Sequence, residues 1–243
     1  MLPRLRTMLR LLSLQSSYTY ERLQGIGIAV AQEPLLEPLA ADPPRAREAR
    51  SRSAQYFNAH PFLASIAVGA LSRAELDGED GNRIVRLRTA LSGPLGSLGD
   101  QLFWAGVVPA LMGIALVASS LGRGLETLVA IVIGYNLFRV VIMIWGLRVG
   151  FAHGLKVAGE LSQSRLVELA ALAGTVAAWV IGVAIPWIAK WQLRGAGQST
   201  RSVIVLVGVA FVIGVLTRHR PLPVPMLTLG VGAMTVIWRW SFS

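Results

Sequence analysis

The chain has 243 residues, of which 53% are hydrophobic and only 15% are charged, against about a quarter charged in an average soluble domain. Its formal net charge is +10 and it has no cysteine, so disulfides, thiolate nucleophiles and Cys-ligated metals are excluded. The basic residues flank apolar segments, as expected for loops that meet anionic lipid headgroups. We therefore expect an all-α, multi-pass membrane protein that contacts lipid and binds no nucleic acid, for which no motif is present.

Residues 1–14 place four leucines at helical spacing with three arginines among them. This pattern predicts a basic amphipathic helix that lies in the membrane interface. A cleaved signal peptide is the competing interpretation. Such a peptide needs an apolar core of adequate length after the arginines and a small-residue cleavage site, and neither is evident in the sequence.

Four prolines between Glu33 and Pro44 break any long helix, and the basic run Arg45–Arg52 follows them. We expect residues 1–55 to hold the amphipathic helix and a cytoplasmic or interfacial connector, and residues 56–243 to form the membrane domain. Within that domain, Pro61–Leu71 is apolar but too short to span, which is typical of a re-entrant or interfacial piece. The acidic stretch Glu75–Asp80 is predicted to be a solvated loop.

The stretch Leu91–Asp100 contains Gly93, Pro94 and Gly99, so its backbone is predicted to be a broken helix that lines a cavity or is buried in protein. About five transmembrane helices follow. Their predicted bounds are Leu102–Leu121, Thr127–Leu147, Leu169–Ala189, Ser202–Thr217 and Leu222–Trp238. The arginine excess before the first span predicts a cytoplasmic N-terminus.

Asn136 and Arg139 lie one turn apart in the middle of a predicted span, where a charged side chain costs at least about 2.5–3.5 kcal/mol. Both should face protein or water. Either they satisfy backbone groups of the helix bundle, or they contribute to a substrate path, and the spacing leaves both interpretations open.

Asn58 and His60 stand just before Pro61, beside aromatic residues. Neutral groups that both donate and accept hydrogen bonds suit sugar hydroxyls, and aromatic faces suit a sugar ring. The alternative is that Asn58 caps the following helix and His60 is a satisfied structural donor. Asp100 precedes an uncharged span, so it either caps that helix or accepts hydrogen bonds from a sugar beside the broken backbone.

Catalytic signatures are weak in this sequence. The three histidines at 60, 153 and 219 are separated by whole spans, and neither HExxH nor GxSxG occurs. A membrane-embedded hydrolase that uses His60 and Asp100 would lack a marked nucleophile. We expect no catalytic residue, no metal and no cofactor in this chain.

Four blocks in chain order resemble the IID component of the mannose, fructose and sorbose family of the phosphoenolpyruvate-dependent phosphotransferase system. Tyr18–Gly27 resembles an aromatic-Glu-Arg-Met-Gln-x-x-Gly element, and Tyr56–Phe62 resembles a Phe-Phe-Asn-Thr-(His or Gln)-Pro block. Gly93–Trp104 is similar to the signature Gly-Pro-Leu-Ala-Gly-x-Gly-Asp-x-x-Phe-Trp, the most specific of the four. Tyr135–Lys156 is similar to the Phe-Asn-x-x-Arg and glycine-rich pattern of the family.

The resemblance implies a non-catalytic subunit of the cell inner membrane. It would pair with a IIC partner, as a trimer of such pairs with an elevator-like moving core, while cytoplasmic IIA and IIB proteins phosphorylate the hexose. Asn58, His60 and Asp100 would face the sugar, and Asn136 and Arg139 would hold the broken helices together. Three departures leave open a degenerate IID-like scaffold or sensor without sugar flux: Val108 before Pro109 where the family has arginine, the reduced element Val167–Ala170, and an outer loop Trp191–Arg201 that is shorter than usual.

Overall fold

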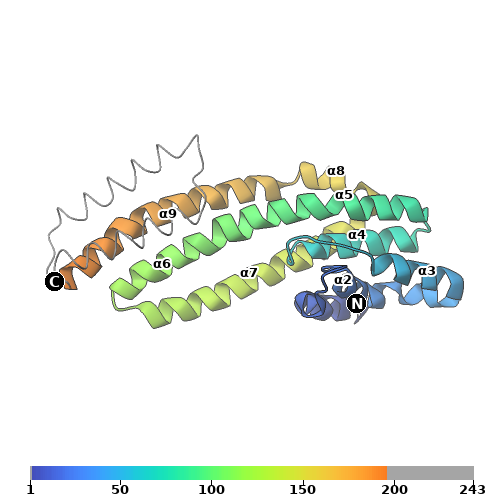
Figure 1. Cartoon of the computed structure of the whole chain (residues 1–243), viewed down its shortest axis with the longest axis horizontal. Coiled ribbons are helices and arrows are strands. Elements are labelled where there is room, and N and C mark those ends of the chain that lie inside the picture. The colour runs from blue at the N-terminus through green and yellow to red at the C-terminus, as the bar shows by residue number, and fades with distance from the viewer. Residues whose placement is uncertain (1, 196–243) are drawn as a thin grey trace. The chain divides into compact units, whose positions relative to one another are not determined.

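The computed structural model describes residues 2–195 and, within them, side chains up to residue 191; this part of the chain is helical apart from short connections (Figure 1). The chain divides into two compact units, Met1–Ala184 and Ile185–Ser243. Of the second unit only the helical residues up to 195 are described. The helices are α1 (Leu2–Leu12), η1 (Leu14–Ser17), α2 (Gly25–Leu36), η2 (Glu37–Ala41), α3 (Pro43–Ser53), α4 (Ala64–Leu76), α5 (Gly81–Gly99), η3 (Asp100–Val107), α6 (Val108–Ser120), α7 (Gly124–His153), η4 (Gly154–Lys156), α8 (Val157–Ser162) and α9 (Arg165–Gly195).

Three helical stretches of the described part are long and apolar enough to cross a membrane: Gly81–Ser120, Gly124–Ser162 and Arg165–Trp191. They match the first three predicted spans, although the first stretch begins at Gly81 and not at Leu102 and ends at Ser120, one residue before the predicted end. The predicted spans Ser202–Thr217 and Leu222–Trp238 lie outside the described residues. The count of about five spans therefore stays a prediction.

Helix α4 forms the core of the first unit, where nearly all of its side chains are buried. At 13 residues it is too short to span, as expected, and it is a buried core helix packed chiefly against α7. The two backbones approach closely at glycines: a Cβ on Gly150 would lie 2.1 Å from the Ile66 carbonyl oxygen, and one on Gly69 would lie 2.4 Å from that of Leu147. Gly146 and Gly150 thus form a small-xxx-small contact typical of membrane helices.

The predicted break between Leu91 and Asp100 is wrong, because α5 runs through it to Gly99 with Pro94 inside the helix. Pro94 removes one backbone donor, which a helix tolerates at the cost of local strain. The departure from α geometry begins six residues after Pro94, where Asp100–Val107 (η3) is a π-helix. Short π-helical segments inside α-helices often occur at functional sites, and α6 then continues the same stretch to Ser120.

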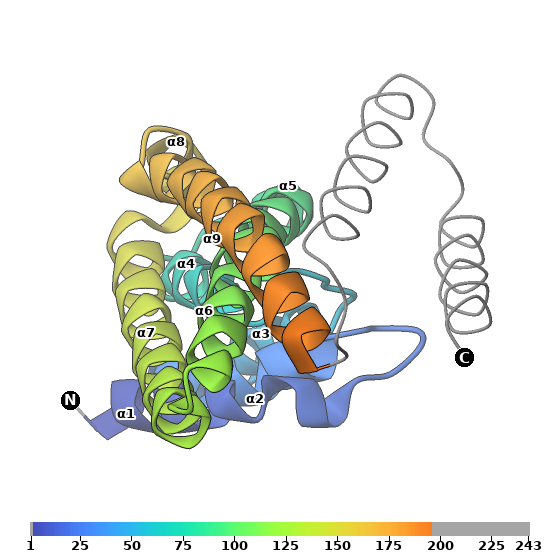
Figure 2. The ribbon, with the colours of Figure 1, turned by 90° about the vertical axis from the view of Figure 1, so that its left-hand side faces the viewer.

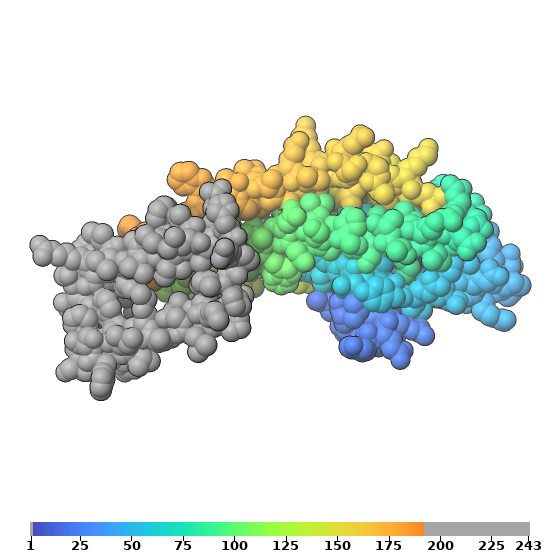
Figure 3. Space-filling model, turned by 45° about the horizontal axis from the view of Figure 1, so that its top comes forward, coloured from blue at the N-terminus to red at the C-terminus, as the bar shows by residue number. Residues whose placement is uncertain are grey.

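Helix α9 packs along the η3–α6 segment through small residues. A Cβ on Gly106 would lie 2.6 Å from Ala173 Cβ, and one on Gly113 would lie 2.7 Å from Val180 Cγ1. The face in Figure 3 shows the result as bands, with α8 and α9 (yellow and orange) above α5 and α6 (green). The lipid-crossing stretches are therefore held together by close backbone approach and not by large side chains.

The predicted connector between α1 and α4 is helical, with α2 and α3 separated near Asp42, whose side chain accepts a hydrogen bond from the Arg45 N–H and caps α3. The prediction that Glu75–Asp80 is a solvated loop is wrong at its first two residues, because α4 continues to Leu76. Glu75 belongs to α4 and only 3% of it is exposed, because it pairs with Arg52 of α3. The boundary predicted at residue 55 stays a prediction.

Candidate functional site

Residues 56–63, between α3 and α4, carry two of the predicted sugar-facing residues and are held by the N-terminal block. The side chain of Gln24 donates to the Ala59 carbonyl at 2.6 Å and accepts from the Ala59 N–H at 3.2 Å. The Gln24 N–H also donates to the Phe57 carbonyl at 2.9 Å. Gln24 is buried, so this two-way bond fixes the backbone on both sides of Asn58.

Asn58 is exposed and does not cap α4, which begins at Ala64 with Leu63 as its N-cap. The capping interpretation of Asn58 is therefore wrong. Its Oδ1 accepts a hydrogen bond from the Tyr18 hydroxyl at 3.0 Å, and its backbone N–H donates to Ser92 Oγ at 3.2 Å. The amide group is thus oriented by the first block and its backbone by α5, while no hydrogen bond of its Nδ2 is found within the described residues.

His60 is 98% buried, stacked on Phe103 of η3 with 4.8 Å between ring centroids, with Phe62 edge-on at 5.0 Å. Its Nδ1 accepts from the Phe62 N–H at 3.4 Å, so in this tautomer the proton sits on Nε2. Nε2 is fully enclosed and has no hydrogen-bond partner within residues 2–191. An unpaired buried donor costs about 1–3 kcal/mol, so His60 is not the satisfied structural donor that the alternative required.

Burial lowers the pKa of His60 to about 4, although the negative charge of Asp100 nearby opposes this shift. The imidazole is therefore neutral at physiological pH, and its Nε2–H is a neutral donor. A neutral donor suits an uncharged hydroxyl-bearing ligand and gives no special attraction for an anion.

Gly99 and Asp100 come to this place from the end of α5. A Cβ on Gly99 would lie 2.1 Å from His60 Cβ, so only glycine allows the α5 backbone to pass the histidine. Asp100 is exposed and lies inside the continuous helical stretch, so the predicted helix cap is wrong. Within the described residues its carboxylate forms no hydrogen bond or ion pair, and its negative charge acts on the nearby His60.

The fourth block approaches from α7. Phe103 contacts Tyr135 and Phe138 at 6.3 and 5.6 Å between ring centroids, and the Arg139 guanidinium lies 5.0 Å from the Phe62 ring centroid. Arg139 Nε is buried without a hydrogen-bond partner among the described side chains. Arg139 therefore meets the aromatic cluster, and its role in a substrate path stays a prediction.

Asn136 does not hold helices together in the described structure. It is exposed, and its Nδ2 donates to the Val132 carbonyl of its own helix at 2.8 Å. Gly93 and Pro94 are also exposed, and a Cβ on Gly93 would meet nothing within 4 Å. These three residues take no part in the cluster around His60.

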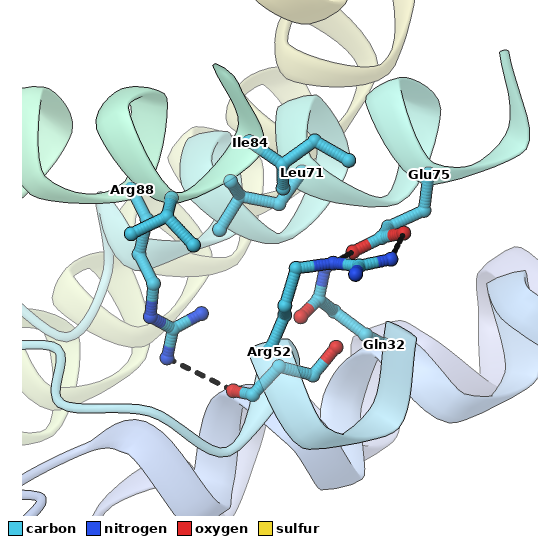
Figure 4. A pocket seen from close by; sticks show the side chains of 8 residues that line it. Gln32, Arg52, Leu71, Glu75, Ile84 and Arg88 are labelled. Carbon is cyan, nitrogen blue, oxygen red and sulfur yellow. Dashed lines mark hydrogen bonds and ion pairs between the residues drawn. The ribbon is translucent and has the colours of Figure 1, made fainter. Parts of the chain in front are cut away.

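A buried polar cluster between α2, α3, α4 and α5 supports the same segment from the other side (Figure 4). Arg88 donates to three carbonyl groups of the segment before Asn58, those of Ser53, Gln55 and Tyr56, at 2.9, 2.6 and 3.1 Å. Its guanidinium also lies 5.3 Å from the Phe57 ring centroid. Sequence reasoning did not single out Arg88, and its position inside an apolar helix pattern was the available signal.

In the same cluster, Arg52 forms a two-point ion pair with the buried Glu75, with both N···O distances at 2.8 Å. This hydrogen bond raises the pKa of Arg52. Figure 4 shows Gln32 beside the pair, around a cavity of about 10 Å³, close to the smallest volume that holds one water. The cluster locks α3 to α4.

All four sequence blocks therefore converge on His60, although the first and the fourth are more than a hundred residues apart in the chain. The first block orients Asn58, the second contains it, the third stacks on His60, and the fourth closes the aromatic cluster. Among the described residues no group of three His, Asp or Glu side chains could hold a metal ion. Fold and site together define a helical membrane protein with several spans and a polar site at a π-helix, in which a neutral imidazole lies near a carboxylate.

Comparison with known proteins gives the family. Residues 3–209 match the family described as PTS system mannose/fructose/sorbose family IID component. The chain is similar to the fructose permease IID component of Bacillus subtilis (26% identity), the mannose-specific EIID component of Escherichia coli K12 (28%) and the sorbose-specific EIID component of Klebsiella pneumoniae (30%). The chain belongs to the mannose/fructose/sorbose family of phosphotransferase system IID components.

Each of these matches covers 73% of this chain and 63–65% of the relative, so the matched part spans less than two thirds of those proteins. Two solved structures share the fold. One is described as a membrane protein, with a TM-score of 0.78, 20% identity and coverage of 99% of this chain and 96% of the other. The second is the mannose transporter ManYZ in complex with microcin E492, with a TM-score of 0.58, 23% identity and coverage of 76% and 69%.

Proposed function

We propose that the chain is the IID membrane subunit of a sugar permease that takes up a hexose. A IIC partner completes the translocation path, as a trimer of IIC–IID pairs, and cytoplasmic IIA and IIB proteins phosphorylate the sugar during uptake. The chain itself is a non-catalytic subunit of the inner membrane with its N-terminus in the cytoplasm. Its relatives are IID components of fructose, mannose and sorbose systems, which supports the substrate class and leaves the hexose open.

The observation that carries this proposal is the unpaired, enclosed Nε2–H of His60 beside the free carboxylate of Asp100. Because Nε2 is enclosed in this structure, a sugar hydroxyl reaches it only after the surrounding aromatic rings move. The neutral donor and the carboxylate acceptor then bind adjacent hydroxyl groups, and an aromatic face completes a sugar site. Trp104, 56% exposed and 5.8 Å from the His60 ring, supplies such a face. Asn58 adds a third polar group whose amide is oriented by Tyr18.

The test is hexose-dependent phosphorylation and uptake in vesicles that contain the chain with the IIA, IIB and IIC proteins of its own system. We expect Asp100→Asn and His60→Ala to reduce both rates by tenfold or more at matched protein levels. Asp77→Asn and His153→Ala are the matched controls, because Asp77 pairs with Arg73 on the surface and His153 bonds its own helix. Rates for both site variants equal to those of the controls would remove the two residues from the site.

The second candidate is a IID-like scaffold or sensor that binds a IIC-like protein without sugar flux. The departures at Val108 and at Val167–Ala170 are the observations that favour it. This candidate predicts that the chain co-purifies with the IIC protein while no hexose is phosphorylated by the complete wild-type system. Phosphorylation of any hexose above the rate without the chain would exclude it.

A further inference from the structure

Helix α1 presents an apolar face that nothing in the described structure covers. Thr7 and Leu11 are buried, at 0% and 2% exposure, on the side that packs against α2. On the other side, leucines at helical spacing are strongly exposed: Leu2 at 64%, Leu5 at 59%, Leu9 at 59% and Leu12 at 46%. Four leucines in one exposed row are more than the scattered apolar residues of an ordinary water-facing surface.

The arginines of α1 hold this orientation and make the helix basic. Arg6 pairs with Glu37 at 3.3 Å, Arg10 donates to the Val30 carbonyl at 2.9 Å, and the Arg4 guanidinium lies 5.0 Å from the Phe151 ring centroid. All three contacts lie on the body of the protein, so the leucine row cannot turn inward without breaking them. The helix contains three arginines and no acidic residue.

The contact with Phe151 shows at which depth of the membrane α1 lies. The exposed apolar face of α7 runs from Leu125 to Val141, about 24 Å at 1.5 Å per residue and close to the thickness of the hydrocarbon layer. Phe151 follows Val141 by about 15 Å, on the part of α7 that packs against α4. Phe151 therefore lies about 39 Å from Leu125 along α7, past the hydrocarbon layer of about 30 Å and at the level of the headgroups.

The direction of α1 is the one expected of a helix at the headgroup level. α7 runs along the horizontal of Figure 1, and α1 runs along the horizontal of Figure 2, which is turned by 90° about the vertical. α1 therefore crosses α7 instead of running beside it. A helix that crosses a membrane-spanning helix at the headgroup level lies in the plane of the bilayer, with its exposed leucines available to the acyl chains.

We propose that the leucine row of α1 is a membrane-surface anchor that inserts into a leaflet rich in anionic lipid. The charge of the helix complements anionic headgroups, which attract basic segments by about 1 kcal/mol per Lys or Arg near the surface. This proposal requires that the chain spans a membrane and is independent of sugar transport.

The absence of cysteine from the whole chain permits a direct test. The full chain carrying Leu9→Cys is spin-labelled and reconstituted in vesicles of phosphatidylcholine with phosphatidylglycerol. Collision rates are then measured with oxygen, which concentrates in the bilayer, and with a water-soluble nickel chelate. Asn82→Cys is the matched control, because Asn82 is exposed in the polar turn that begins α5.

We expect the label at position 9 to collide with the nickel chelate at least threefold less than the label at position 82, and with oxygen more. Equal nickel collision rates at the two positions would show a water-facing helix and overturn the proposal. Protection from both reagents would also overturn it, because the row would then be covered by protein, such as a second copy or a partner subunit. Burial in the bilayer that is unchanged when phosphatidylglycerol is left out would overturn the preference for anionic lipid.

Discussion

Replacing Gly99 by alanine is expected to displace His60 and weaken the site. The added Cβ would lie 2.1 Å from His60 Cβ and 2.4 Å from His60 Cγ, whereas real Cβ contacts essentially never fall under 3.0 Å. These two atoms are the root of a side chain whose ring is stacked on Phe103, so they cannot yield as the end of a flexible side chain does. Either the imidazole or the α5 backbone must move.

The magnitude follows from comparison with Gly93 of the same helix, where an added Cβ meets nothing within 4 Å. Gly93→Ala should stabilise the helix by about 0.5–1 kcal/mol, because alanine has less backbone entropy to lose. Gly99→Ala has the same gain in helix propensity, from which overpacking subtracts about 1–3 kcal/mol. The propensity term cancels in the difference, so Gly99→Ala should be less stable than Gly93→Ala by about 1–3 kcal/mol.

The assay is unfolding of both variants in the same mild detergent, followed by circular dichroism, together with hexose-dependent phosphorylation in reconstituted vesicles. Gly99→Ala should unfold at a lower temperature than Gly93→Ala and should lose phosphorylation, whereas Gly93→Ala should retain it. Equal unfolding temperatures and equal rates for the two variants would show that His60 and α5 adjust without cost, which would refute the steric argument.

Three further predictions concern the buried polar groups. Arg88→Met should lower hexose-dependent phosphorylation although Arg88 touches no sugar, because three carbonyl groups before Asn58 lose their donor; an unchanged rate in vesicles would exclude this positioning role. Glu75→Gln should destabilise the fold by about 3–5 kcal/mol in detergent unfolding because it breaks a buried ion pair, whereas Glu48→Gln, whose side chain is 70% exposed, should change stability by less than about 1 kcal/mol. His60 has a folded-state pKa of about 4, below its ordinary 6.5. Its contribution to stability is therefore fully present above pH 6.5 and falls by up to about 1.4 kcal/mol per pH unit towards pH 4. The free energy of unfolding of His60→Gln should depend less steeply on pH in that window, and identical slopes for the variant and the wild type would contradict this prediction.

Much of the fold was predictable because lipid imposes it. Long uncharged segments must be helical, and the three described spans match the first three segments predicted from hydropathy, to within one residue at Leu121. Their ends were less predictable, because the first stretch continues into a polar half that packs against protein and carries the buried Arg88. The break predicted at Gly93 and Pro94 failed for a related reason, since one proline inside a long helix removes a single hydrogen bond that the neighbouring turns can tolerate.

The candidate site was predictable in its residue types and not in its geometry. Asn58, His60 and Asp100 stand out as polar groups beside apolar segments, and the resemblance groups them. The support of each group depends on contacts across the chain that no local pattern contains: Tyr18 on Asn58, Phe103 on His60, and Gln24 on Ala59. Position 99 requires glycine because two segments of the chain lie in close contact there, and not because the chain turns. The glycine content of the sequence does not reveal such a contact, so it predicted a broken helix instead.

These contacts imply that the site is only as well ordered as its supports. Gln24 and Arg88 fix the backbone of residues 53–59 from opposite sides, and both are themselves buried. Because Asn58 and His60 lie on an irregular segment with few backbone bonds of its own, a loss on either side lets the segment move, while Asp100 stays on its helix. The separation between donor and carboxylate would then change, and with it the fit to a pair of hydroxyl groups. Gln24 and Arg88 touch no ligand, and yet they affect sugar affinity because they hold the segment that carries Asn58 and His60. Replacing either residue should weaken sugar binding in a chain that still folds and inserts.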